Sequence, residues 1–250
     1  MIALNTGNVA PLTGSKIEQR PFLILKMGST FAEISALRGD FENWIAAACE
    51  KTSTFSYEVL HVPSGLLPAR LDWAGILITG SHAMVSDNPS WQRPIMAWLE
   101  RAISKGIPVL GICFGHQLLA EMAGGRVGNH PCGLEIGTCT IETTGSAVTD
   151  PLFEGLPNRF SANTIHYQSV LQLPATATVL ACNNHDQHHA YRIDDSVWGV
   201  QFHPEFDRLV MRGYIDAVAA RGESVGSADT GNTPHAESLL RHFTSFCLSG

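Results

Sequence analysis

The chain of 250 residues is long enough for one large domain or two small ones, and it can bury an apolar core without disulfide bonds. Hydrophobic residues make up 44% of the sequence and charged residues 16%, which excludes a disordered chain. The net charge is −7 and there is no run of Lys or Arg, so nucleic acid is not expected as a partner.

The N-terminal stretch MIALNTGNVAPLTGSK lacks the basic start and the apolar core of a signal peptide. No stretch of the sequence reaches the ~18 apolar residues of a membrane helix. The six cysteines include no C-x-x-C pair, so neither a disulfide framework nor a zinc or thioredoxin-type site is predicted. We therefore expect a cytoplasmic protein that has no membrane partner and no metal.

The first half of the chain alternates short apolar runs with amphipathic runs of helical spacing. Residues 1–20 are polar and rich in turn formers, and we interpret them as an N-terminal extension. Strands are then predicted at 22–25, 57–62, 75–79 and 107–112. Helices are predicted at 38–50, at 91–103 with an end at Lys105-Gly106, and at 114–123. This order is typical of β-α-β units in a parallel sheet with helices on both faces.

After residue 134 the pattern changes to short β-branched runs separated by turns. These predict antiparallel or mixed strands added to the same sheet, at 136–142, 159–166, 178–182, 190–193 and 197–202. Helices are expected at 209–220 and again after Thr233, separated by a Gly/Ser/Asp-rich loop over 221–232. No repeat and no linker interrupts residues 21–220, so 21–250 are predicted to form a single α/β domain.

Residues 107–123, IPVLGICFGHQLLAEMA, place Cys113 between a buried strand and a helix. Gly111 and Gly115 flank the cysteine, as in the elbow that holds a nucleophile out at the carboxyl edge of a sheet. The helix N-terminus favours a thiolate at this position. A buried cysteine in a glycine-rich turn is the alternative without catalysis.

A thiolate nucleophile needs a base and a carboxylate that orients the base. In VWGVQFHPEF, residues 197–206, His203 and Glu205 are two residues apart after a strand, so their side chains project to the same side. Pro204 puts the pair at a strand end or edge, where sites form in parallel sheets. His-Pro-Glu alone is weak evidence, but with the elbow it predicts a Cys–His–Glu triad.

The pairing of GICFGHQ with HPEF, in this order and about 90 residues apart, resembles the class I (triad-type) glutamine amidotransferases. The resemblance covers most of 22–220 and is greatest to their GMP-synthase-like single-domain branch. It implies a flavodoxin-like α/β fold, with Cys113 as the nucleophile that attacks the γ-carboxamide of glutamine. His203 is then the general base and acid, and Glu205 orients it. Ammonia leaves, and water resolves a γ-glutamyl thioester.

Two backbone amides are expected to form the oxyanion hole. The amide of Phe114, directly after the nucleophile, follows from the elbow geometry. The second comes from the resemblance, because GILITGSHAMVSD at 75–87 is similar to the family's strand-then-glycine loop. This similarity points to the amide of Gly80.

Three further residues are implied to bind the substrate. Gln117 lies one helical turn after Cys113, and in the family this glutamine contacts the substrate. IHYQSV at 165–170 resembles the segment whose backbone holds the α-amino and α-carboxylate groups, which points to Tyr167 and Gln168. Gln168 departs from the branch, in which Asp is common at this position.

Other candidate motifs are set aside. His166 is an alternative base, although a structural role is the stronger expectation. NHDQHH at 184–189 lacks a helical H-x-x-x-H or a paired-cysteine pattern, so we predict a solvated loop and no metal site. Neither phosphate-binding nor dinucleotide-binding glycine motifs are present, so no cofactor is predicted.

The sequence leaves the fate of the ammonia open. A complete synthase needs an ATP-using domain, for which this chain has no residues left. Either a separate synthase chain takes the ammonia, or the protein is a stand-alone γ-glutamyl hydrolase or peptidase without an acceptor. A DJ-1/PfpI-like cysteine protein is the less favoured alternative, because it needs neither Gln117 nor the His203-Pro204-Glu205 segment.

Overall fold

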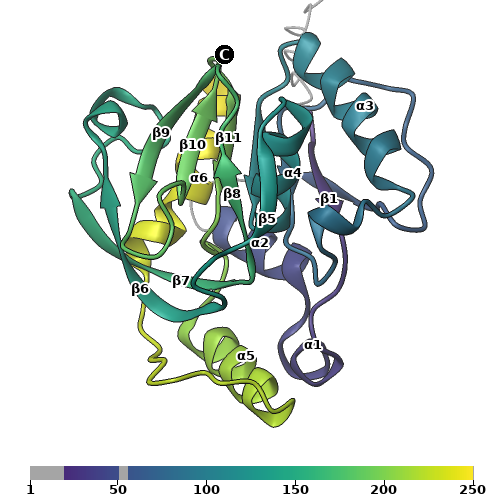
Figure 1. Ribbon diagram of the computed structural model, residues 1–250. Helices are drawn as coiled ribbons and strands as arrows, with labels where there is room; N and C mark the ends of the chain where they lie inside the picture. Colours follow the sequence, from purple (N-terminus) through teal and green to yellow (C-terminus); the bar gives the residue numbers. More distant parts are fainter. Residues whose placement is uncertain (1–19, 51–55, 250) are drawn as a thin grey trace, which may run out of the picture.

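The computed structural model describes residues 20–50 and 56–249. In these residues a nine-stranded sheet has the order β2-β1-β3-β4-β11-β10-β9-β6-β7, and β5 pairs with β8 in a second sheet (Figure 1). The strands are β1 (Phe22–Lys26), β2 (Tyr57–His61), β3 (Ile76–Ile78), β4 (Val109–Ile112), β5 (Arg126–Asn129), β6 (Glu135–Thr143), β7 (Arg159–His166), β8 (Gln168–Gln172), β9 (Ala177–Cys182), β10 (Ala190–Ile193) and β11 (Val197–Val200). The helices are α1 (Ala32–Arg38), α2 (Phe41–Cys49), α3 (Gln92–Ser104), α4 (Phe114–Met122), α5 (Arg208–Ala220) and α6 (Pro234–Ser249).

Five strands, β2, β1, β3, β4 and β11, form the parallel half of the large sheet. Alternate residues of β1 enter opposite faces. Phe22 and Ile24 pack in one apolar core with residues of α2 and α6, and Leu23 and Leu25 pack in another with residues of α3 and α4. The predicted parallel sheet with helices on both faces is therefore confirmed.

The remaining strands, β10, β9, β6 and β7, form the antiparallel half, which confirms the added strands. β6 and β7 pair in continuous register from Glu135–His166 to Glu142–Arg159. A single bridge joins Asn163 of β7 to His203, beyond the end of β11. The antiparallel half is thereby attached to the segment that carries the predicted base.

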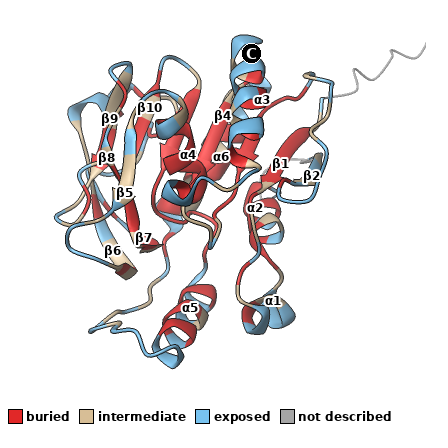
Figure 2. Cartoon of the chain, turned by 45° about the vertical axis from the view of Figure 1, so that its right-hand side comes forward, coloured by how far each residue is buried: buried red, intermediate tan, exposed pale blue. Residues whose placement is uncertain are grey.

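Two helices lie beyond the carboxyl ends of the parallel strands. α1 and α5 pack against each other through Ile34, Val210 and Met211, which belong to a small apolar core of their own. Figure 2 shows that buried residues fill the central strands, whereas α1 and α5 each keep one exposed side. These helices form a wall beside the site described below.

Some elements differ from the sequence prediction. The helix predicted at 38–50 begins at Phe41, because the extended Asp40 caps it: Asp40 Oδ1 accepts a hydrogen bond from the Phe41 amide. Helix α1 was not predicted, since its only buried residue is Ile34 and no apolar stripe marks it. Strands β5 and β8 were also not predicted; they are short and pair only with each other in the second sheet.

The predicted N-terminal extension, residues 1–20, lies outside the described residues except for Arg20. In the parts of the chain that the structure describes, no helix combines the length and apolarity needed to cross a bilayer.

Candidate active site

Cys113 occupies a sharp turn between β4 and α4, as the elbow pattern predicts. Its backbone has φ 51° and ψ −100°, a region that residues other than glycine rarely adopt. The turn depends on two close backbone approaches. A Cβ on Gly111 would lie 2.5 Å from the carbonyl of Gly115, and a Cβ on Gly115 would lie 2.8 Å from the Ile78 carbonyl oxygen. Side chains at 111 and 115 are therefore excluded by the shape of the turn.

The Cys113 side chain faces a pocket and is only 9% exposed as a residue. Its Sγ lies 3.7 Å from the carbonyl oxygen of Ile165. Cys113 also stands at the N-cap of α4, at the positive end of the helix dipole. By contrast, burial raises the pKa of the Cys49 and Cys139 thiols to about 12. Cys113 is the cysteine that lines the pocket beside His203.

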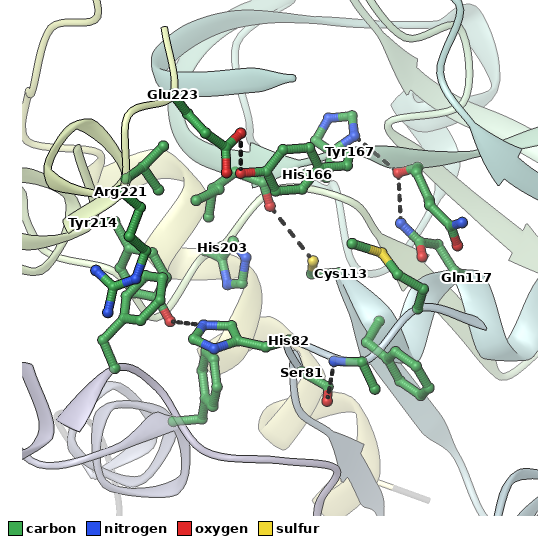
Figure 3. A pocket seen from close by; sticks show the side chains of 18 residues that line it. Ser81, His82, Cys113, Gln117, His166, Tyr167, His203, Tyr214, Arg221 and Glu223 are labelled. Atoms are coloured by element: carbon green, nitrogen blue, oxygen red, sulfur yellow. Dashed lines mark hydrogen bonds between the residues drawn. The ribbon is translucent and has the colours of Figure 1, made fainter. Parts of the chain in front are cut away.

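His203 and Glu205 meet as predicted: His203 Nδ1 lies 2.8 Å from Glu205 Oε1, and both side chains are buried. The His203 amide donates to the Asn163 carbonyl at 2.7 Å, and its ring stacks on Phe206 with a 4.0 Å centroid distance. These contacts fix the ring so that it faces the pocket beside Cys113 (Figure 3). Its Nε2 has no hydrogen-bond partner among the described residues, so this atom is available to a reacting group.

Burial on its own lowers the pKa of His203, because it disfavours the imidazolium. The charges of Glu205 and Cys113, together with the hydrogen bond to Glu205, outweigh burial and raise the pKa to about 10. His203 is thus held as an imidazolium near neutral pH, between a carboxylate and the sulfur. Asp207, the other nearby carboxylate, caps α5 by accepting hydrogen bonds from the amides of Leu209 and Val210. It is therefore not the partner of His203.

Gly80 lies two residues after the end of β3 and directly before Ser81, which lines the pocket. A Cβ at this position would lie 3.1 Å from His203 Cε1, so the glycine backbone lies against the imidazole. Thr79 fixes the loop: its Oγ1 accepts from the Met27 amide at 3.0 Å and donates to the Gly80 carbonyl at 2.8 Å. Phe114 is the first residue of α4 and lines the pocket. The structure thus brings both predicted oxyanion residues to the surroundings of Cys113.

The predicted substrate-binding residues, Gln117, Tyr167 and Gln168, all line the pocket that Cys113 faces. Gln117 Nε2 donates to the Gln168 carbonyl at 2.7 Å and to Gln201 Oε1 at 2.9 Å. The Gln168 side chain is occupied elsewhere, since it hydrogen-bonds Ser86 Oγ at 2.5 Å and Asn129 Oδ1 at 3.1 Å. Tyr167 Oη donates to Glu223 Oε2 at 2.8 Å. The Gln168 side chain is therefore bound to neighbouring loops, and its carbonyl is bound to Gln117.

A buried histidine cluster, made of Glu135, His166 and His189, lies next to the turn at Tyr167, where His166 Nδ1 is 3.0 Å from the Gln168 carbonyl oxygen. Glu135 Oε2 is 2.8 Å from His166 Nε2 and 3.0 Å from His189 Nε2. Burial raises the pKa of Glu135, but hydrogen bonding and the charges of the two histidines lower it well below its usual range. The cluster's ligand-type atoms lie within 4.8 Å of one another, so it could hold a metal ion. As arranged, hydrogen bonds join it and tie β6 to the turn at Tyr167.

His166 lies in this cluster, which agrees with the structural role expected for it. The prediction of a solvated loop at 184–189 is wrong in part. His189 is fully buried and Asp186 is 2% exposed. The segment folds inward because it leads into β10, and His188 Nδ1 lies 2.6 Å from the Val170 carbonyl oxygen. No periodicity of apolar residues in this segment indicates its burial.

The pocket beside Cys113 is a cavity of about 240 Å³. On the side of His203 it is lined by residues that sequence reasoning missed, namely Phe31, His82, Tyr214, Val218, Arg221 and Glu223. Apart from His82, which lies in the loop after β3, they come from α5, its following loop and the segment before α1, and no motif marks them. Only His82 had a signal, since it lies within the GILITGSHAMVSD segment.

A family model described as "Glutamine amidotransferase class-I" matches residues 39–212. A glutamine-hydrolysing GMP synthase of Aeropyrum pernix is 35% identical over 152 residues, which are 59% of this chain and 28% of that protein. Gamma-glutamyl peptidase 5 of Arabidopsis thaliana is 26% identical over 206 residues, 80% of this chain and 82% of that protein. A glutamine amidotransferase structure from Thermotoga maritima shares the fold, with a TM-score of 0.72 at 19% identity, covering 93% of this chain and all of that one. The chain thus spans less than a third of the length of the GMP synthase.

Proposed function

Because the chain belongs to the class-I glutamine amidotransferase family, we propose that it cleaves the γ-amide bond of glutamine or of a γ-glutamyl compound through a thioester on Cys113, with residues 21–250 acting as one domain. One observation carries this proposal: a single cysteine, held at positive φ at the amino end of α4, shares a pocket with His203, which is hydrogen-bonded to Glu205 behind it. A nucleophile, a base and an orienting carboxylate are the parts that such chemistry requires.

The proposed reaction starts with His203 as an imidazolium and Cys113 as a thiolate. The Cys113 sulfur attacks the γ-carbonyl carbon, the C–N bond breaks, and the imidazolium of His203 gives its Nε2 proton to the leaving nitrogen. Neutral His203 then takes a proton from water as the water oxygen attacks the thioester, and the sulfur leaves as thiolate. Glu205 orients the ring and stabilises its positive charge. The amides of Phe114 and Gly80 stabilise the tetrahedral oxyanion.

The glutamyl part of the substrate is assigned to the side of the pocket at Gln117. We propose that the Gln117 side chain and the backbone of Tyr167 and Gln168 hold its α-amino and α-carboxylate ends. The engagement of the Gln168 side chain with Ser86 and Asn129 supports a backbone role for this residue.

Ammonia released from glutamine would pass to an acceptor on a separate synthase chain. The similarity to a longer GMP synthase supports this destination. A second candidate, hydrolysis of larger γ-glutamyl conjugates without an acceptor, is favoured by the continuation of the pocket past Cys113 on the side of His203.

The proposal is tested with the purified full chain, by measuring glutamate release from glutamine and from γ-glutamylanilide. Treatment with diazo-oxo-norleucine, a glutamine-like electrophile, is expected to label Cys113. Label concentrated on Cys49, Cys139 or Cys182, with no glutamate released, would refute the assignment. Low basal turnover of glutamine that rises on adding a cell fraction favours the coupled enzyme. High turnover of a γ-glutamyl peptide that no fraction changes favours the stand-alone hydrolase.

A further inference from the structure

The pocket has two chemically different sides about Cys113. The side at Gln117 and Gln168 presents amide and carbonyl groups. The side beyond His203, where Figure 3 shows His82 and Tyr214, presents aromatic rings from three segments. They are His82 in the loop after β3, Tyr214 in α5, and Phe31 before α1, which contacts both of the other rings. We call the group of Phe31, His82 and Tyr214 the aromatic wall.

The position of the departing nitrogen, which must face His203, puts the leaving group of the substrate against the aromatic wall. This step rests on the proposed function, in which His203 protonates the departing nitrogen. That nitrogen must come within hydrogen-bond reach of His203 Nε2 in the transition state. Any substituent on the nitrogen is then directed away from the glutamyl side, toward the rings beyond His203. Ammonia, which has no substituent, would leave this part of the cavity without an occupant.

The aromatic wall is held in place before any ligand arrives. The Phe31 ring centroid lies 4.3 Å from that of His82 and 5.3 Å from that of Tyr214. Thr30 Oγ1 donates to Tyr214 Oη at 2.7 Å, and Phe206 stacks against Tyr214 at 4.9 Å. Because Phe206 also stacks on His203, the base and the aromatic wall belong to one rigid group. Such preorganisation lowers the entropy cost of binding a ring.

The charged residues at the rim are already paired. Arg221 Nη2 lies 2.9 Å from Glu33 Oε1, and its guanidinium covers Phe31 at 4.0 Å. Glu223 accepts a hydrogen bond from Tyr167. Burial lowers the pKa of His82, which keeps this imidazole neutral and adds no charge to the aromatic wall. The surface therefore matches an uncharged ring better than a carboxylate or an ammonium group.

We propose that the aromatic wall is a leaving-group subsite, and that the substrate class is γ-glutamyl amides whose nitrogen carries an apolar, aromatic substituent. The products are glutamate and the free arylalkyl or aryl amine, and water is the only co-reactant. Edge and face contacts with Phe31, His82 and Tyr214 would supply the preference over a small alkyl amide.

The test compares γ-glutamylbenzylamide with γ-glutamylmethylamide, because both release an alkylamine and only one carries a ring. We expect kcat/KM for the benzylamide to exceed that for the methylamide by roughly tenfold or more. Phe31→Ala should bring this ratio close to one, and Phe31→Leu, which keeps apolar volume, should give an intermediate ratio. Tyr214→Phe keeps the ring and should keep the preference. Leu37→Ala, at an 85% exposed position of α1 outside the pocket, is the matched control and should leave the ratio unchanged.

The outcomes separate this inference from the proposed function. If Cys113 is labelled and glutamate is released, but the benzylamide is no better than the methylamide, the subsite is refuted and the function stands. A higher kcat/KM for γ-glutamylglycine than for the benzylamide also refutes it, in favour of a carboxylate-bearing leaving group. If Cys113 is not labelled and no amide is cleaved, the proposed function itself fails.

Discussion

The two halves of the central sheet hold their parts of the candidate site by different means. The parallel half delivers Cys113 through backbone shape: apolar cores on both faces, two glycines and one residue at positive φ. The antiparallel half presents the turn at Tyr167 from a buried polar interior, the Glu135–His166–His189 cluster. Added side-chain volume should therefore disturb the elbow at Cys113. Changes of charge or pH should disturb the turn at Tyr167.

The largest expected effect is the loss of the nucleophile itself. Cys113→Ser keeps the turn, because serine is similar in size, and should lower glutamate release by at least about 10⁴-fold. Glutamate release and thermal unfolding are measured together, and the melting temperature should change little. Cys132→Ser removes an exposed thiol and is the matched control, expected to retain full activity. Full activity of Cys113→Ser would place the nucleophile elsewhere.

The next largest effects distinguish the proposed base, His203, from the carboxylate proposed to orient it, Glu205. His203→Ala should lower kcat/KM by roughly 10⁴-fold, and Glu205→Gln by much less, because the imidazole still moves the proton. Asp207→Asn is the control, since it touches only the cap of α5. Severe loss with Asp207→Asn and none with Glu205→Gln would show that the wrong carboxylate has been chosen.

The pH dependence follows from the raised pKa of His203. The imidazolium protonates the leaving nitrogen, so activity should persist through neutral pH and fall as pH rises through about 10. Glu205→Gln removes a charge that raises this pKa, so the alkaline limb of the kcat/KM profile should move to lower pH. An unchanged limb in this variant would contradict the electrostatic role of Glu205.

A larger side chain at the elbow tests how tightly the parallel half is packed. Gly111→Ala puts a Cβ 2.5 Å from backbone atoms of Gly115, and we expect a loss of about 2–4 kcal/mol of unfolding free energy. Gly145→Ala is the matched control, because nothing lies within 4 Å of a Cβ there. Urea denaturation of both variants measures the difference. Equal stability of the two would mean that the elbow is less tightly packed than described.

Removing a buried charge tests the antiparallel half, and we expect it to lower the unfolding free energy by a smaller amount. Glu135→Gln leaves the two histidines with a weaker acceptor and should cost about 1–3 kcal/mol at pH 7. The folded-state pKa of Glu135 is depressed, so its contribution is present above the unfolded pKa of ~4.3 and declines as pH falls below that value. The difference in unfolding free energy between wild type and variant should therefore be smaller at pH 3 than at pH 7. Glu154→Gln, at an exposed position, should show no gap at either pH.

The parallel half could be predicted closely from the sequence, because its signals are local. Buried strands appear as continuous apolar runs, helices as apolar stripes, and the elbow as glycines at fixed distances from Cys113. The pairing of His203 with Glu205 was predictable for the same reason, since the two residues are near neighbours in the chain. Helix α1 escaped prediction because it buries a single residue.

The rest of the site depends on contacts between distant segments. Glu135, His166 and His189 come from three strands or their ends, and each one alone resembles a surface polar residue in the sequence. Phe31 and Tyr214 likewise meet only because α1 and α5 pack together beyond the sheet. No spacing rule connects such positions, so the sequence predicts Cys113 and His203 as a nucleophile and its base but does not predict the aromatic wall beside them.

The backbone conformation of Cys113 also restricts how this site can evolve. At φ 51° and ψ −100° any L-residue is strained, and a second substituent on Cβ adds to the clash. Serine matches cysteine in shape, whereas the branched Cβ of threonine, which serves as a nucleophile on other scaffolds, adds to the strain. The repertoire of nucleophiles accessible at position 113 is therefore limited by the geometry of a single residue before reactivity is selected at all.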